Sequence, residues 1–245
     1  MKNLKLLTGF LAAAVFFCSF APKGNISGED LLHNMYKRYS GKWYKDFQFS
    51  QTTENYRNDS LIRTSVWREA ILFPYNFRIS FGEVKDGNAM IQKKDSTFNF
   101  RKGKLVRKAP NGEDLTFLLG GMYFIPFDSV KTRMIKEGYD ISKIHESTWQ
   151  GQKTYVLGTN KDEERANQLW VDKDKLIVVR YIKYSGDGKE EGIFKDHRKF
   201  AGGWSETATD FYINDKLIQK EKYFDCKANA GIDMKLFDTD NFYQQ

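Results

Sequence analysis

The stretch 153–185, KTYVLGTNKDEERANQLWVDKDKLIVVRYIKYS, restricts the fold most strongly. Its hydrophobic residues alternate with a period of two through three successive segments, and short polar turns separate these segments. In the second segment, for example, Leu169 and Val171 lie opposite Trp170. A period of two is typical of β-strands, because successive side chains of a strand point to opposite faces. The stretch therefore predicts an antiparallel meander.

Both faces of this meander carry apolar side chains over part of its length. In a sheet with one solvated face, that face is normally polar. A second layer of protein or a ligand must therefore cover the second face of this meander. The alternation alone leaves open which face that is, because Trp170 competes with the pair Leu169 and Val171 for the covered side.

The same period recurs through most of the chain. Residues 47–72 predict a long hairpin that turns at Asn58-Asp59, and short strands follow up to Lys108. Three further strands are predicted over 192–200, 206–213 and 217–227. The total is about 11 or 12 strands, in a mostly β fold of the α+β class.

Two segments have helical spacing instead. Ser27 and Asp30 resemble a capping box, and the apolar residues that follow predict an amphipathic helix of about 13 residues. From Leu115 onwards a second, unusually apolar segment is interrupted by Gly120-Gly121, and a further helix is predicted from Pro126 to about Lys136. Such an apolar segment must lie against a large apolar surface.

Residues 1–21 have the three-part layout of a secretory signal peptide, which predicts export of the chain. Their apolar run is shorter than the roughly 20 residues that a membrane-spanning helix needs. An uncleaved anchor and lipid attachment at Cys18 are the less favoured alternatives, the second of which would attach the protein to the outer membrane. Removal of the leader leaves Cys226 as the only cysteine, so no internal disulfide can form.

Residues 22–245 contain no linker or repeat, so we expect a single domain. We also expect the protein to be a monomer. The formal net charge of +7 is spread among interleaved Lys, Asp and Glu residues. This diffuse distribution favours a solvated surface with transient contact to a membrane, and an exported chain has little reason to meet nucleic acid.

Catalytic signatures are weak. The sequence has three histidines, each without a second ligand at metal spacing, and it contains none of the motifs of zinc or nucleophile-elbow enzymes. We therefore expect no catalytic residues, no metal and no cofactor. A secreted hydrolase that uses Glu69 or Asp196 with His197 is the unfavoured alternative, because neighbours on a strand point to opposite faces.

The helices are too few and too short to cover a curved sheet of about 11 strands. Incomplete cover leaves a cavity, and an apolar cavity in an exported protein suggests a lipid or acyl-chain ligand. A binding protein for another apolar ligand, and a structural envelope protein with a filled core, are the remaining alternatives. A fully packed concave face would favour the latter.

Several sequence blocks resemble the Lol-type periplasmic carriers, the LolA-like and LolB-like proteins that sort lipoproteins to the outer membrane. The blocks occur in the family's order, and the resemblance is greatest to the variant of Bacteroidetes-type bacteria. They are FQFSQTTENY from Phe47, VW at Val66-Trp67, PYNFRIS from Pro74, KKDSTFNFRKG from Lys93, LWVDKDKLIVVR from Leu169, and NAGIDMKLF from Asn229.

The resemblance implies a half-open antiparallel barrel with an N-terminal helix and a short helical lid over an apolar cavity. It also implies that lipoprotein acyl chains are received from an inner-membrane ABC-type transporter and passed to an outer-membrane acceptor. On this basis we expect the cavity to be lined by Trp67, Tyr75, Phe77, Ile79, Phe98, Trp170 and Val179. We expect the lid to comprise Leu115, Leu118, Leu119, Met122 and Phe124, within the segment 115–127.

One position departs from the family pattern. The family's carrier often has an arginine just before the proline that matches Pro74, where it holds the lid shut, and this chain has Phe73. Arg68 and Arg78 are the nearest candidates to substitute for it.

Overall fold

The structure is a computed structural model, and it describes residues 26–111, 115–161, 163 and 165–242. The signal peptide predicted over residues 1–21, with Cys18, lies outside the described residues. Within them the fold is mostly β, as the sequence predicts. None of the helices in this part of the chain has the length and apolar character needed to cross a membrane.

Thirteen strands of the described residues form one antiparallel sheet. In chain order they are β1 (Asp46–Arg57), β2 (Ser60–Leu72), β3 (Asn76–Phe81), β4 (Ala89–Lys93), β5 (Ser96–Arg101), β6 (Lys104–Pro110), β7 (Ile144–Trp149), β8 (Gln152–Leu157), β9 (Gln168–Asp172), β10 (Val178–Ser185), β11 (Gly188–Lys195), β14 (Ala208–Ile213) and β15 (Lys216–Ala228). Two short strands, β12 (Arg198–Phe200) and β13 (Gly203–Ser205), pair separately.

The helices are α1 (Gly28–Tyr39), α2 (Leu115–Leu118) and α3 (Phe127–Lys136). Three single 3-10 turns accompany them: η1 (Val84–Asp86), η2 (Gly121–Phe124) and η3 (Met234–Phe237). The capping box at Ser27 and Asp30 is present at the start of α1, as predicted. We call residues 115–136 the helical insert.

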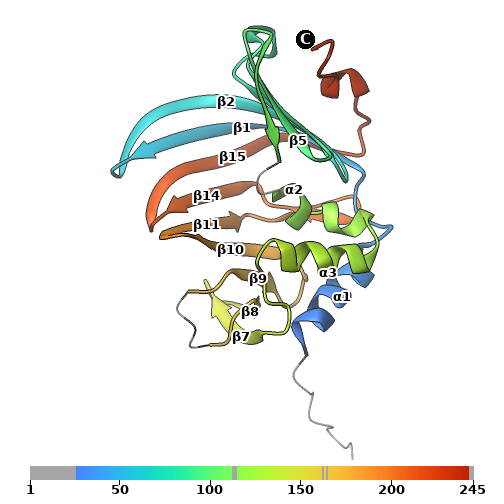
Figure 1. Cartoon of the computed structure of the whole chain (residues 1–245), viewed down its shortest axis with the longest axis vertical. Helices are drawn as coiled ribbons and strands as arrows, with labels where there is room; N and C mark the ends of the chain where they lie inside the picture. The colour runs from blue at the N-terminus through green and yellow to red at the C-terminus, as the bar shows by residue number, and fades with distance from the viewer. Residues whose placement is uncertain (1–25, 112–114, 162, 164, 243–245) are drawn as a thin grey trace, which may run out of the picture.

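The order of the main sheet is β6-β5-β4-β3-β2-β1-β15-β14-β11-β10-β9-β8-β7, so β6 and β7 are its two edges. The sheet bends strongly without closing, and α1, α2 and α3 lie on its concave side (Figure 1). This confirms the half-open barrel. The long β1–β2 hairpin is also confirmed, and its turn residues Asn58 and Asp59 have the positive φ values of 48° and 62° that suit a tight hairpin.

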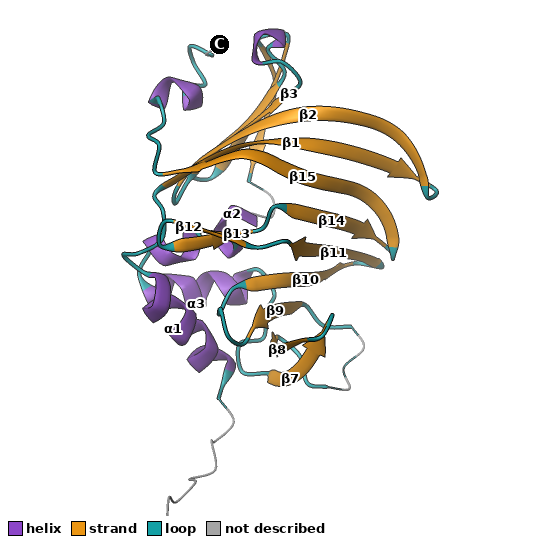
Figure 2. Ribbon diagram, turned by 180° about the vertical axis from the view of Figure 1, so that it is seen from behind, coloured by secondary structure: helices purple, strands orange, loops and turns teal. Residues whose placement is uncertain are grey.

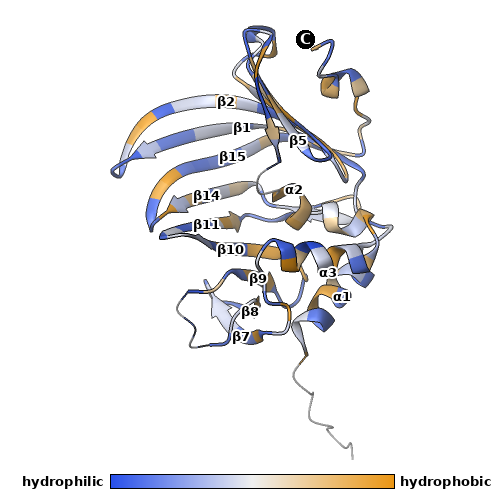
Figure 3. Cartoon of the chain, in the orientation of Figure 1, coloured by the Kyte–Doolittle hydropathy of each residue, from blue (hydrophilic) through white to orange (hydrophobic). Residues whose placement is uncertain are grey.

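The helices cover only part of the concave side. Viewed from behind, α1 and α3 lie beside the β7–β10 end of the sheet, and α2 lies closer to β1, β14 and β15 (Figure 2). Leu31, Leu32 and Met35 of α1 are completely buried in the main core, together with Leu169 and Val171 of β9. The colouring by hydropathy shows the apolar character of α2 at this surface (Figure 3).

This packing decides which face of the central meander is covered. Leu169 and Val171 face the helices, whereas Trp170 lies on the opposite face. There its ring is 5.6 Å from the ring of Trp149, and the Arg180 guanidinium lies 4.9 Å from its centre.

The helical insert breaks where the sequence predicts. Gly120 has a φ of 156°, and a Cβ atom at this position would lie 2.5 Å from Nε1 of Trp43. Only glycine fits so close to the indole ring, so the chain can turn there and separate α2 from η2. The predicted second helix is also confirmed: α3 ends at Lys136, and Gly138 follows with a φ of 84°.

Two predictions about strands were wrong. The strand β7 was missed because its sequence, IHESTW, has few apolar residues; it is an edge strand that pairs only with β8. The predicted strand 192–200 is split at Asp196, which has a φ of 53°, into β11 and β12. The described chain therefore contains fifteen strands, more than the count from periodicity.

The convex side of the sheet carries a second, smaller core. Residues 233–242, which we call the tail, pack across β2, β4 and β5. Phe237 of the tail is 1% exposed, and it shares this core with Ala70, Ile91 and Phe100. The tail has no hydrophobic period because it lies on the sheet without belonging to it.

Candidate functional site

A cavity of about 350 Å³ lies between the concave side of the sheet and the helical insert. This volume falls in the range of small-molecule sites, and most of the wall is apolar. The apolar wall consists of Tyr44, Phe47, Phe49, Trp67, Ile71, Phe73, Phe77, Ile79, Met90, Leu115, Leu119, Phe194 and Phe211. The polar wall consists of Glu69, Gln92, Thr116, Ser205, Glu206, Gln219, Glu221 and Tyr223.

Strand alternation produces this wall. On β2, Trp67, Glu69 and Ile71 point inwards, and the residues between them point to the convex side. In the neighbouring strands Glu69 pairs with Phe49 of β1 and with Ile79 of β3. A carboxyl group is thus held among apolar side chains by backbone pairing on both sides.

Five of the predicted residues come together at this cavity. Trp67, Phe77 and Ile79 line the sheet side, and Leu115 and Leu119 of the insert line the opposite side. The strand period explains the first three, because they share the concave face of the paired strands β2 and β3.

The other predicted cavity residues lie elsewhere. Tyr75 is 44% exposed just before β3. Phe98 pairs with Ile91 and packs under the tail on the convex side. Trp170 also faces away from the helices, and Val179 is buried in the main core and does not line the cavity. To place these four residues correctly, one must know which face of each strand points to the cavity. Periodicity alone does not provide this.

The remaining residues of the predicted lid have structural contacts. Leu118 and Met122 are buried in the main core. Phe124 stacks on Phe73 with ring centres 5.3 Å apart and an angle of 7° between the rings. The side chain at the position of the family's arginine therefore contacts the insert by aromatic stacking.

Neither candidate substitute for that arginine reaches the insert. Arg68 donates a hydrogen bond to the Gly82 carbonyl (2.7 Å) and forms an ion pair with Glu83 (2.9 Å). Arg78 lies on the convex side, where it donates a hydrogen bond to the Leu236 carbonyl in the tail (3.0 Å). The proposal that either arginine closes the lid is thus wrong, because both alternate with the cavity-facing residues of their strands.

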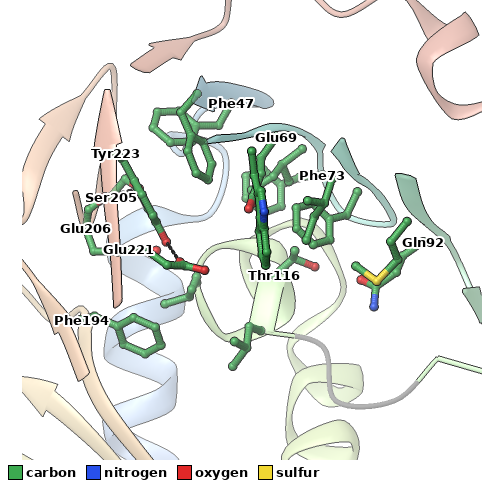
Figure 4. A pocket seen from close by; sticks show the side chains of 18 of the residues that line it. Phe47, Glu69, Phe73, Gln92, Thr116, Phe194, Ser205, Glu206, Glu221 and Tyr223 are labelled. Carbon is green, nitrogen blue, oxygen red and sulfur yellow. Dashed lines mark hydrogen bonds between the residues drawn. The ribbon is translucent and has the colours of Figure 1, made fainter. Parts of the chain in front are cut away.

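Three carboxyl groups lie on the polar part of the wall, and we call Glu69, Glu206 and Glu221 the carboxylate cluster (Figure 4). Burial raises the pKa of each of them, and for Glu206 it raises the pKa to about 7. Mutual repulsion adds to the effect, since the charges of Glu221 and Glu206 further raise the pKa of Glu69.

The hydrogen bonds within the cluster are unequal. Glu221 accepts hydrogen bonds from Gln51 (2.9 Å), Gln219 (2.6 Å) and the Tyr223 hydroxyl (3.0 Å). The Glu69 side chain, in contrast, makes no hydrogen bond or ion pair with the other described residues. Sequence reasoning singled out Glu69 but missed Glu206 and Glu221, which lie more than a hundred residues away along the chain.

The structure does not bring together the residues of the alternative hydrolase site, Glu69 or Asp196 with His197. Glu69 lines the cavity of about 350 Å³, whereas His197 lies beside the backbone of Val178 at a much smaller cavity, which shares Leu119 and Glu206 with the first. Burial lowers the pKa of His197 to about 4, and Asp196 next to it is exposed. Among the described residues, no group of His, Cys, Asp or Glu side chains is placed to hold a metal ion.

No family profile and no curated protein matches this sequence. Solved structures with the same fold nevertheless exist. A DUF1329 family protein from Desulfovibrio piger matches with a TM-score of 0.61 at 15% identity, over 88% of this chain and 98% of that one. A putative outer membrane lipoprotein-sorting protein domain from Vibrio parahaemolyticus matches with a TM-score of 0.60 at 12% identity, over 86% and 96%.

A LolA superfamily protein from Nitrosomonas europaea matches with a TM-score of 0.55 at 14% identity, over 88% of this chain and 99% of that one. These likenesses extend over nearly the whole length of all three proteins. The chain therefore has a LolA-like fold, as its sequence blocks indicate.

Proposed function

We propose that this protein is a non-enzymatic periplasmic carrier that binds the acyl chains of lipids or lipoproteins and moves them towards the outer membrane. The observation that supports this best is the mostly apolar cavity between the concave side of the sheet and the helical insert. Its wall offers aromatic and aliphatic contacts from β1 to β4 and from α2, which suits a flexible hydrocarbon chain.

Release is the main physical problem for such a carrier. Burial of an acyl chain contributes about 0.8 kcal/mol per methylene, so long chains bind too tightly to leave a closed cavity quickly. The helical insert has features of a movable cover, since α2 is only a single turn and Gly120 separates it from η2. A closed state nearly as stable as the loaded one would return part of the binding energy on release.

The partners in this proposal follow from the same role. The acyl chains would come from an inner-membrane ABC-type transporter and go to an outer-membrane acceptor, with transient contact at each membrane. The likeness to a putative lipoprotein-sorting domain supports this route through its fold. A binding protein for another apolar ligand is the second candidate. The cavity itself argues against a structural protein with a filled concave face.

Displacement of the neutral fluorescent probe N-phenyl-1-naphthylamine tests the proposal. The substitution Leu119→Asp places a charge in the apolar wall, and we expect probe affinity to fall by about tenfold or more. Leu119 is the better choice than Leu118, because Leu118 is 6% exposed within the main core and a charge there would unfold the protein.

The matched control is Ile135→Asp. Ile135 lies on α3 of the same insert but is 58% exposed, so the same change of charge leaves the cavity intact. Equal probe affinity in Leu119→Asp and in the native chain would contradict the proposed site.

A further inference from the structure

The carboxylate cluster is unusual in a cavity for acyl chains, because a hydrocarbon ligand leaves it without a partner. Glu206 is only 7% exposed, yet its side chain lines the cavity. Among the described residues, no Lys, Arg or His side chain lines this cavity. Buried carboxylates without a cation are strongly disfavoured, so either protons or a cation from a ligand must neutralise them.

The cluster also has too few hydrogen-bond donors. Gln51 and Gln219 donate to Glu221, and the single hydroxyl proton of Tyr223 is shared between Glu221 and Glu206, so Glu69 is left without a donor. Independently of the carboxylates, the side-chain oxygen of Gln51 is buried and accepts no hydrogen bond, although the amide lies next to Glu221. A buried group of acceptors that lacks donors indicates a ligand rich in N–H donors.

A primary ammonium group has the matching chemistry. It carries one positive charge and three donors and accepts no hydrogen bond, so it can bind several carboxylates at once. The apolar walls next to the cluster, from Trp67 to Leu119, suit a hydrocarbon chain attached to such a group. A bare metal ion would not use these walls.

We propose that the cavity selects acyl-chain ligands with a primary amine, whose ammonium group binds within the carboxylate cluster while the chain lies against the apolar wall. This inference rests on the proposed carrier function and names the ligand class within it. A phosphate beside the amine would bring negative charge to the cluster, so an amine without an adjacent phosphate is the preferred form.

Competition against N-phenyl-1-naphthylamine with ligands of equal chain length tests this. Decylamine, decanol, decanoate and decylphosphoethanolamine are compared at about pH 7.5, where the amine is charged. We expect decylamine to bind at least about tenfold more tightly than decanol, and decanoate to bind most weakly. Tighter binding of decylphosphoethanolamine than of decylamine would overturn the preference for an amine without phosphate.

The triple variant Glu69→Gln, Glu206→Gln and Glu221→Gln keeps the side-chain shapes but removes the charges. Its ratio of decylamine affinity to decanol affinity should fall to about one. The control variant carries the same change at three exposed positions, Glu29, Glu83 and Glu146, and should keep the native ratio. Far-ultraviolet circular dichroism verifies that both variants are folded.

Two outcomes separate this inference from the carrier proposal. If decanol binds but decylamine has no advantage, or if the triple variant keeps the native ratio, amine selection is wrong and the apolar cavity remains a binding site. If none of the four ligands displaces the probe, the carrier proposal and amine selection both fail.

Discussion

Glu206 illustrates how the surroundings of one residue set its chemistry. Its ordinary pKa of 4.5 is raised to about 7, first by burial and then by the nearby charge of Glu221. Glu69 and Tyr223 face the same space. The carboxyl group is therefore half protonated near neutral pH, where an exposed glutamate would be fully charged.

This raised pKa predicts a loss of stability with rising pH. Between about pH 4.5 and pH 7 the folded chain holds a proton on Glu206 that the unfolded chain has released, so the free energy of unfolding falls as pH rises. The stabilisation is complete below about pH 4.5 and is lost through about pH 7, a change of about 3 kcal/mol. Glu206→Gln should remove this part of the pH dependence.

Urea unfolding of the native chain and of Glu206→Gln at about pH 4.5 and pH 8 measures the difference directly. The native chain should lose about 3 kcal/mol more than the variant over this range. Parallel losses in the two proteins would show that Glu206 ionises normally. Groups outside the carboxylate cluster are common to both chains and cancel in the comparison. Glu206→Gln also removes the repulsion that raises the pKa of Glu69, which changes the pH dependence in the same direction.

Gly120 offers a second prediction at the residue scale. A Cβ atom there would lie 2.5 Å from Nε1 of Trp43 and 2.9 Å from the Phe73 ring, in addition to the strain of the positive φ. We expect Gly120→Ala to lower the free energy of unfolding by about 2 kcal/mol or more. Gly151→Ala is the control, because Gly151 has a φ of 79° and nothing within 4 Å of the added atom.

Thermal unfolding of both alanine variants separates the two contributions. The control reports the cost of the positive φ alone, which is about 1 kcal/mol. A loss in Gly120→Ala no greater than that in Gly151→Ala would mean that the insert relaxes freely around the new methyl group.

At the scale of elements, the helical insert combines anchored and releasable parts. Val130 and Met134 of α3 are completely buried, and Phe127 packs against His33 and Tyr36 of α1. The Phe73–Phe124 stack, in contrast, joins the η2 turn to the end of β2 by a single aromatic contact. We expect this contact to break when the insert moves away from β2.

We therefore expect Phe124→Ala to accelerate ligand release. An aromatic pair contributes about 1 kcal/mol, so the dissociation rate of N-phenyl-1-naphthylamine should rise by about fivefold. Stopped-flow displacement measures this rate. Phe127→Ala is the matched control, since it removes the same ring from the insert at its contact with α1; an equal rise in both variants would contradict a specific role for Phe73–Phe124.

The sequence predicts most elements but not all of them. The hairpin around Asn58-Asp59, the helix from the Ser27 capping box and the break at Gly120 are local patterns, and the structure confirms them. The edge strand β7 was missed because a strand with one partner needs few apolar residues. The split at Asp196 was missed because the separate β12–β13 pair is not encoded in the local period.

At the scale of the whole molecule, the two sides of the sheet have different roles. The concave side carries the cavity and the helices, and the convex side of β2, β4 and β5 is covered by the tail. Stability of the tail and binding in the cavity should therefore be separable by substitution.

Phe237→Ala tests this separation. Phe237 is 1% exposed within the smaller core, so its truncation should lower the free energy of unfolding by about 3 kcal/mol. Binding of N-phenyl-1-naphthylamine at a temperature where the variant is folded should be unchanged. Phe77→Ala, on the cavity side of β3, should instead weaken probe binding. Loss of binding in Phe237→Ala would mean that the tail holds the shape of the cavity wall.

The sequence by itself determined that this protein is mostly β, that its N-terminal helix and apolar insert supply the few helices, and that a cavity remains. These properties follow from hydrophobic period and from the ratio of sheet to helix, which are local or additive. Only the tertiary structure decided which side of each strand faces that cavity, because a period of two is the same for either face. It alone brought Glu69, Glu206 and Glu221 together, because pairing between distant strands joins residues that no local pattern connects.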